Sequence, residues 1–165
     1  MSMRLKEREG EIQQVLGRLA EESDNGIPTI VEGRKDVEAL RSLGIEGVVI
    51  SAKSGGRSLL DVISEVEKGH PKEVILLLDC DRRGNEYTRR LRQHLETAKI
   101  VANTSIRREL FRLVGKEVRD VESLGAYLET LRKKYMGHQR TLTSLKRAQA
   151  KRIRIYRRKL KEEEH

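Results

Sequence analysis

The sequence predicts an α/β fold built on a parallel sheet of about four strands flanked by helices. Four short apolar runs suit strands, and they span residues 27–31, 47–50, 73–79 and 99–102. Between them, apolar residues recur at every third or fourth position, as in amphipathic helices. Strands that alternate with helices in this way imply right-handed βαβ units and therefore parallel strands. The third run is apolar without alternation, which is typical of a strand buried on both faces.

Breaks in the pattern divide the chain into three segments. Residues 1–26 are predicted to form an N-terminal helix, which ends at Asp24-Asn25-Gly26. Residues 27–136 hold the sheet and its helices. After Gly137 the pattern predicts a separate long helix, so residues 137–165 are expected to form a basic C-terminal extension.

Composition excludes several classes of protein. The chain has 165 residues, one cysteine, and no apolar run near the roughly 18–20 residues that a membrane span needs. A single cysteine cannot form an internal disulfide or a structural zinc site. The first residues are charged and lack the apolar stretch of a signal peptide. Membrane proteins, disulfide-rich secreted domains and zinc fingers are therefore excluded, and a cytoplasmic location is expected.

The excess positive charge is concentrated at the C-terminal end. The net charge is +9, yet residues 1–129 hold 22 basic and 23 acidic residues. Residues 130–161 contain 13 Lys and Arg and no acid. Such a segment is expected to bind a polyanion, although a solvated helix or one that meets a protein partner would look similar. With few aromatic residues nearby, folded RNA or duplex is a better match than stacked single strands. The predicted contacts in this segment are Arg140, Lys146, Arg147, Lys151, Arg152, Arg154, Arg157, Arg158 and Lys159.

Acidic residues follow two of the predicted strands. Glu32 closes the first strand, and Asp79 closes the third, with Asp81 two residues later. If those strands are neighbours, the three carboxylates meet at one sheet edge, where ligands bind in open α/β sheets. Hard oxygen ligands of this kind suit Mg²⁺. The alternative is that each acid caps the helix that follows.

Two sequence motifs together resemble the Toprim domain, which topoisomerases, bacterial-type primases, some nucleases and recombination proteins share. The first reads Val31-Glu32-Gly33-Arg34-Lys35-Asp36, and the second reads Leu78-Asp79-Cys80-Asp81-Arg82-Arg83-Gly84. The resemblance covers about residues 27–115. It implies that Glu32 is a general acid/base and that Asp79 and Asp81 hold Mg²⁺ or Mn²⁺, with Asp36 as a further acid. The catalytic set is then Glu32, Asp79 and Asp81, and the metal set adds Asp36.

One departure from the family pattern narrows the expected function. Topoisomerases commonly carry a further glutamate where this chain has Asn85, followed by Glu86. The chain is more similar to the small primase-like group, which includes ribonucleases that mature 5S ribosomal RNA. We therefore expect a Mg²⁺-dependent protein that hydrolyses structured RNA. The alternatives are a non-catalytic RNA-binding protein associated with the ribosome, and a primase-like or repair role on DNA.

Four basic residues outside the tail lie near the same predicted edge. Lys53 and Arg57 flank a glycine-rich loop that is expected either to hold phosphate or to serve as a turn. Arg82 and Arg83 follow the metal acids and are expected either to contact a scissile phosphate or to screen the acids.

Overall fold

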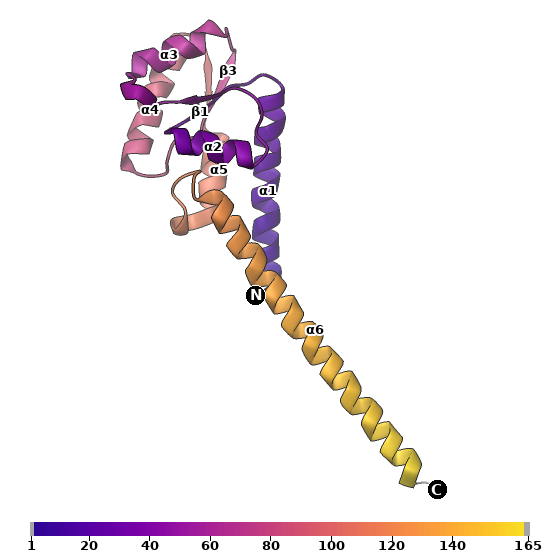
Figure 1. Ribbon diagram of the computed structural model, residues 1–165. Helices are drawn as coiled ribbons and strands as arrows, with labels where there is room; N and C mark the ends of the chain where they lie inside the picture. The colour runs from indigo at the N-terminus through magenta and orange to yellow at the C-terminus, as the bar shows by residue number, and fades with distance from the viewer. Residues whose placement is uncertain (1, 164–165) are drawn as a thin grey trace.

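The computed structural model describes residues 2–163, and it confirms the predicted α/β class (Figure 1). Its sheet has four parallel strands in the order β2-β1-β3-β4. Each strand is shorter than the apolar run that predicted it. The strands are β1 (Thr29–Val31), β2 (Val49–Ser51), β3 (Glu73–Leu76) and β4 (Val101–Asn103).

Strands β1 and β3 lie side by side, as the predicted site requires. Thr29 pairs with Ile75, and Ile30 pairs with Leu76. From β1 the chain goes first to β2 on one side and later to β3 on the other, so the strand order reverses between β1 and β3. The carboxyl ends of the strands at such a reversal form the usual ligand crevice of an open α/β sheet.

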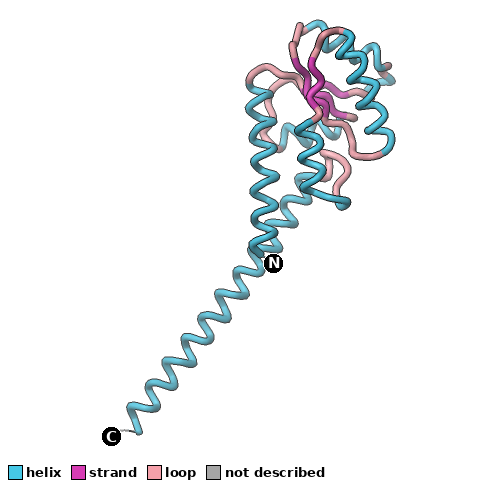
Figure 2. Tube along the Cα trace, turned by 180° about the vertical axis from the view of Figure 1, so that it is seen from behind, coloured by secondary structure: helices cyan, strands magenta, loops and turns pink. Residues whose placement is uncertain are grey.

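Helices cover both faces of the sheet (Figure 2). One core layer joins Val31, Ile75 and Leu77 to α1, α2, α5 and α6. The other joins Ile30, Leu76 and Leu78 to α3 and α4, so successive strand residues enter opposite layers. This two-sided burial explains why the third run lacks alternation. The helices are α1 (Ser2–Asp24), α2 (Arg34–Ser42), α3 (Leu59–Lys68), α4 (Arg82–Thr97), α5 (Ser105–Val114) and α6 (Leu124–Glu163), with short 3₁₀ turns η1 (Ser54–Gly56) and η2 (Gly115–Glu117).

Helix α6 differs from the prediction because it is one continuous helix. The sequence predicted a separate helix after Gly137, whereas α6 runs unbroken from Leu124 to Glu163. A single glycine costs a helix only about 1 kcal/mol, so it need not end one. The predicted segment boundary between residues 136 and 137 therefore falls inside a helix. Residues 164–165 of the predicted extension lie outside the described residues.

The two halves of α6 have different surroundings. Leu124, Leu128 and Leu131 are buried in the core layer that also holds α1. The C-terminal half of the helix leaves the body and projects alone (Figures 1 and 2). At about 1.5 Å per residue, α6 is roughly 60 Å long. No helix within residues 2–163 is both long and apolar enough to cross a membrane.

Candidate functional site

Glu32 joins the two strands at the reversal. It directly follows β1, and its side chain is almost fully buried. Its Oε2 accepts a hydrogen bond of 3.0 Å from the backbone N–H of Asp79, and its Oε1 is paired with the Lys53 ammonium. The carboxylate predicted as general acid/base is thus fixed at the end of β1 by groups from the segment after β3 and from the loop after β2.

Asp79 carries the most perturbed carboxyl group of the described chain. Its Oδ1 is buried and has no hydrogen-bond partner within residues 2–163. Burial, reinforced by the negative charges of Glu32, Asp36 and Asp120, raises the pKa of Asp79 to about 7. A buried oxygen without a partner is costly. A cation at this oxygen would remove the cost and favour the ionised form.

Asp81 serves as the cap of helix α4. Its Oδ1 accepts a hydrogen bond of 2.6 Å from the backbone N–H of Gly84. The alternative hypothesis, that each acid caps the helix that follows, is therefore correct for one oxygen of Asp81. Gly84 allows the tight turn, because a Cβ there would lie 1.9 Å from the backbone oxygen of Asp79. The glycine of the second motif is thus required by the close approach of α4 to the end of the third strand.

Asp36 has a structural position that differs from its predicted place among metal ligands. Its Oδ2 accepts from the N–H of Gly33 at 3.0 Å, and its Oδ1 accepts from the N–H of Glu122 at 3.1 Å. The first bond stabilises the start of helix α2, and the second connects the loop before α6 to that helix. Burial raises the pKa of Asp36, and the two N–H donors oppose that rise. Since both oxygens already have donors, Asp36 acts on the site mainly through its charge.

The acidic side chains meet some of the requirements of a binding site for a divalent cation. No three His, Cys, Asp or Glu side chains within residues 2–163 are gathered closely enough to form a ready-made metal centre. The oxygen of Asp79 that lacks a partner is the observation that favours a cation, and Asp81 is the nearest acid along the chain. Carboxylate oxygens of this kind are what Mg²⁺ prefers. Asp79 and Asp81 are therefore the residues that would hold the ion.

Three residues of this region were not predicted. Arg107 of α5 donates to the backbone oxygens of Leu78 and Asp79 at 2.8 and 2.5 Å. It also donates to Asn85 Oδ1 at 2.7 Å, so the asparagine at the divergent position orients this arginine. Burial lowers the pKa of the Arg107 guanidinium.

The third of these residues, Asp120, lies in the loop after η2. Its charge contributes to raising the pKa of Asp79 and of Asp36. No spacing in the sequence signals Arg107 or Asp120, because both come from segments outside the two motifs. The sequence draws attention to Asn85 only because topoisomerases of the Toprim family commonly carry a glutamate at this position.

The four predicted cations of the body have different surroundings. Arg82 and Arg83 are exposed in the first turn of α4, next to the acids. Lys53 contacts Glu32 directly. Arg57 is paired with Glu65 and donates to the backbone oxygen of Ser51 at 3.2 Å, so the structure uses it to hold the loop after β2.

The predicted cations of α6 are exposed and mostly lack acidic partners. Only Arg158 among them has a carboxylate within 4.0 Å in the described part of the chain, at 3.4 Å from Glu162. The others form an unneutralised array along the projecting half of the helix. The exposed members of this array are Arg140, Lys146, Arg147, Lys151, Arg152, Arg154, Arg157 and Lys159.

The 2-1-3-4 parallel sheet, with acids after the two strands at its reversal, agrees with the Toprim resemblance of the two sequence motifs. The model of the Toprim domain family matches residues 28–113, and the chain belongs to that family. Membership of this family indicates a metal-dependent role on nucleic acid. The match includes every acid of the two motifs, and it excludes α1 and α6.

Known relatives place the chain near a group of archaeal proteins. A UPF0292 protein of Methanocaldococcus jannaschii is 40% identical over 102 residues, which are 61% of this chain and 77% of that one. A UPF0292 protein of Archaeoglobus fulgidus is 32% identical over 118 residues, or 72% of this chain and 90% of that one. A solved structure of a protein from Aquifex aeolicus has a TM-score of 0.57 and 26% identity, and the match covers 67% of this chain and 94% of that chain.

Proposed function

We propose that this Toprim protein binds structured RNA in the cytoplasm and hydrolyses a phosphodiester bond in it, with Mg²⁺ or Mn²⁺ held by Asp79 and Asp81. The observation that carries the proposal is the buried oxygen of Asp79 that lacks a partner, beside the fixed carboxylate of Glu32. Burial and neighbouring acids raise the pKa of Asp79 to about 7, and a perturbation of this kind is typical of functional sites.

Each group at the site has a role that its position supports. A bound divalent ion would neutralise phosphate charge and stabilise the oxyanions of the displacement. Glu32 is held at the end of β1 with one oxygen on Lys53, so these two residues form a proton-transfer pair at the same edge. Arg82 and Arg83 are exposed beside the acids and would contact the phosphate.

Helix α6 supports RNA as the polyanion. It presents a rod of cations with few aromatic residues, and such a surface contacts the phosphates and the shape of a folded nucleic acid rather than its bases. An extension of this length can lie along a groove while the body holds the acid site near the backbone. A protein partner on the same helix would be the alternative use of this surface.

Calorimetry with Mn²⁺ tests the metal site. The wild type should bind the ion, and the double variant Asp79→Asn/Asp81→Asn should not. Asparagine also caps helices, so the start of α4 should remain intact in this variant. The matched control Glu46→Gln/Glu67→Gln removes two exposed acids elsewhere and should bind Mn²⁺ as the wild type does. Equal Mn²⁺ affinity in the Asp79/Asp81 variant and the wild type would overturn the assignment.

The second candidate is an RNA-binding protein that performs no hydrolysis, such as a ribosome-associated subunit. The absence of a three-acid cluster within residues 2–163, together with the use of one Asp81 oxygen as a helix cap, favours this reading. Glu32→Gln separates the two candidates. For a nuclease, this variant should lose cleavage of structured RNA while keeping RNA affinity. If the wild type cleaves neither RNA nor DNA with either ion, the non-catalytic candidate is correct.

A further inference from the structure

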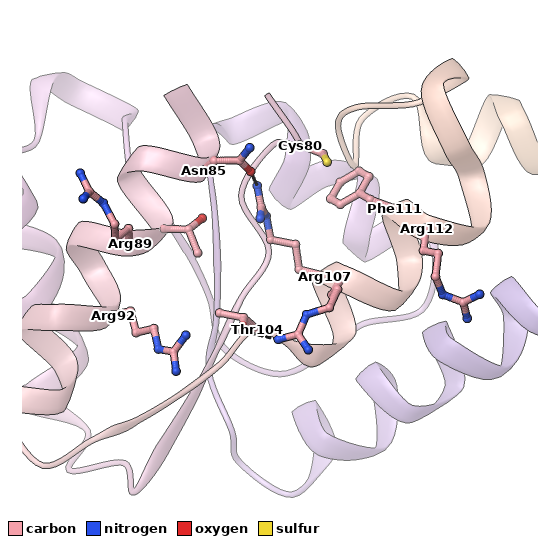
Figure 3. Close-up of a pocket in the computed structure, with 10 residues that line it drawn as sticks. Cys80, Asn85, Arg89, Arg92, Thr104, Arg107, Phe111 and Arg112 are labelled. Atoms are coloured by element: carbon pink, nitrogen blue, oxygen red, sulfur yellow. Dashed lines mark hydrogen bonds between the residues drawn. The ribbon is translucent and has the colours of Figure 1, made fainter. Parts of the chain in front are cut away.

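Five arginines surround one cavity on the α4–α5 side of the acid site (Figure 3). The cavity has a volume of about 450 Å³, within the rough range of 300–1,000 Å³ found for ligand sites. Helix α4 contributes Arg89 and Arg92, and helix α5 contributes Arg107, Arg108 and Arg112.

Most of these arginines have no acidic partner. Arg92 pairs with Glu96 at 2.9 Å, and none of the other four has a carboxylate within 4.0 Å in the part of the chain that the structure describes. The arginines of α4 lie three residues apart, and Arg108 and Arg112 lie four apart on α5. At both spacings the side chains share one helix face, where like charges repel and destabilise the helix. An anion in the cavity would relieve this repulsion.

Shared residues connect the cavity to the acid site. Cys80, which lies between the two motif aspartates, lines the cavity. Arg107 also lines it, and the same guanidinium donates to the backbone oxygen of Asp79. A polyanion that approaches carboxylates is repelled by them. A cationic hollow directly beside those carboxylates offsets the repulsion and holds the polyanion in place.

We propose that this cavity holds a backbone phosphate of the RNA strand, next to the phosphate at the acid site. The proposal rests on the proposed function, because the strand is the one that the acid site would bind. Guanidinium groups bind phosphate with two parallel hydrogen bonds, and Arg89, Arg108 and Arg112 are exposed enough to do so. Phe111 is buried beneath Arg107, whose guanidinium carbon lies 5.9 Å from the ring centroid. Phe111 lines the cavity, but little of its ring is exposed for a base to stack on, which favours phosphate as the ligand.

Fluorescence anisotropy with a labelled RNA hairpin tests the proposal in EDTA, so that no metal contributes. The test variant is Arg89→Gln/Arg108→Gln/Arg112→Gln in the full chain. The control Lys6→Gln/Lys68→Gln/Lys72→Gln removes the same number of exposed charges away from the cavity. We expect the test variant to bind about tenfold more weakly than the control. The slope of log affinity against log salt should flatten by about two to three units, at ~0.7–0.9 per lost phosphate contact.

The outcomes separate this proposal from the proposed function. In EDTA the Asp79→Asn/Asp81→Asn variant should bind the RNA at least as tightly as the wild type, because it lacks two carboxylates that repel phosphate and because the cavity does not need the metal. Equal affinities and slopes in the arginine variant and its lysine control would overturn the cavity proposal, while Mn²⁺ binding would still stand. Failure of the wild type to bind the strand would overturn the cavity proposal together with the RNA part of the proposed function. One further outcome would assign the cavity to a free nucleotide. In that case the wild type and the lysine control would bind ATP, the arginine variant would bind it more weakly, and the RNA would bind both variants equally. The strand proposal would then be wrong.

Discussion

Gly84 determines how closely helix α4 approaches the end of the third strand. A Cβ at this position would meet the backbone oxygen and carbon of Asp79 at 1.9 and 2.8 Å, and backbone atoms cannot move aside as a side-chain tip can. Gly84→Ala should therefore displace the turn that carries both metal acids. We expect a loss of about 1–3 kcal/mol in the free energy of unfolding, measured by urea denaturation, and a loss of Mn²⁺ binding.

A second glycine provides the control for this variant. Gly17 lies inside α1, and a Cβ added there would have nothing within 4 Å. Gly17→Ala should therefore raise the free energy of unfolding by up to about 1 kcal/mol, because alanine favours a helix interior. An equal gain in stability in Gly84→Ala would show that the close approach at Asp79 does not constrain the turn.

The carboxyl group of Asp79 predicts how stability depends on pH in metal-free protein. Its pKa rises from 3.8 to about 7 in the folded chain, chiefly through burial. Between these two values the folded protein holds a proton that the unfolded chain has released. Raising the pH across this interval therefore favours unfolding, and the effect levels off above about pH 7.

Asp79→Asn should remove this contribution, because asparagine does not ionise. In EDTA, the decrease in stability across this interval should be smaller in the variant, because only the raised pKa of Asp36 still contributes, and the variant should be more stable than the wild type at pH 8. Urea denaturation at a series of pH values measures both effects. Identical pH profiles for the two proteins would contradict the raised pKa of Asp79.

At the scale of an element, α6 carries the whole of the excess charge. Deleting residues 138–165 removes ten Lys and Arg and three Glu, so the net charge falls by seven, from +9 to +2. The body should still fold, because Leu124, Leu128 and Leu131 of the buried half remain. If about six of the ten cations meet phosphates, the slope of log RNA affinity against log salt should flatten by about four to five units, at ~0.7–0.9 per contact.

A charge-preserving variant is the control for the deletion. Replacing Arg152, Arg154, Arg157 and Arg158 by lysine keeps the number of charges, so the salt slope should stay close to that of the wild type. Filter binding or anisotropy at several salt concentrations measures the slopes. Equal affinity and slope in the deleted and full-length chains would assign α6 to a protein partner instead of RNA.

At the scale of the whole molecule, an almost neutral body carries a long basic rod. This asymmetry predicts that the protein purified from its native cells at low salt brings nucleic acid with it, seen as excess absorbance at 260 nm. About 1 M salt should remove it, since charge interactions are then screened beyond roughly 3 Å. Ribonuclease should degrade the bound material and deoxyribonuclease should not. Material sensitive only to deoxyribonuclease would favour the DNA role over the RNA role.

The sequence alone predicted the sheet and the place of its acids, because both depend on local patterns. An apolar run without alternation predicts a strand buried on both faces, and an acid that directly follows such a strand must lie at its carboxyl end. Glu32 and Asp79 were therefore predicted at one edge, and the pairing of β1 with β3 brings them together. The charge of α6 could likewise be counted from the residues themselves.

Tertiary structure alone decided how the acids and arginines are used. Whether Asp81 caps a helix or faces an ion depends on the angle at which α4 leaves the sheet, and whether both oxygens of Asp36 have donors depends on the loop before α6. Arg107 reaches the end of the third strand only because α5 follows β4, the strand that pairs with β3. The cavity lined by arginines exists only because the fold brings residues of α4 and α5 to one place, and neither helix contains the position of the other in its own sequence. Local pattern determines which face of an element is buried, and packing determines which side chains of different elements meet.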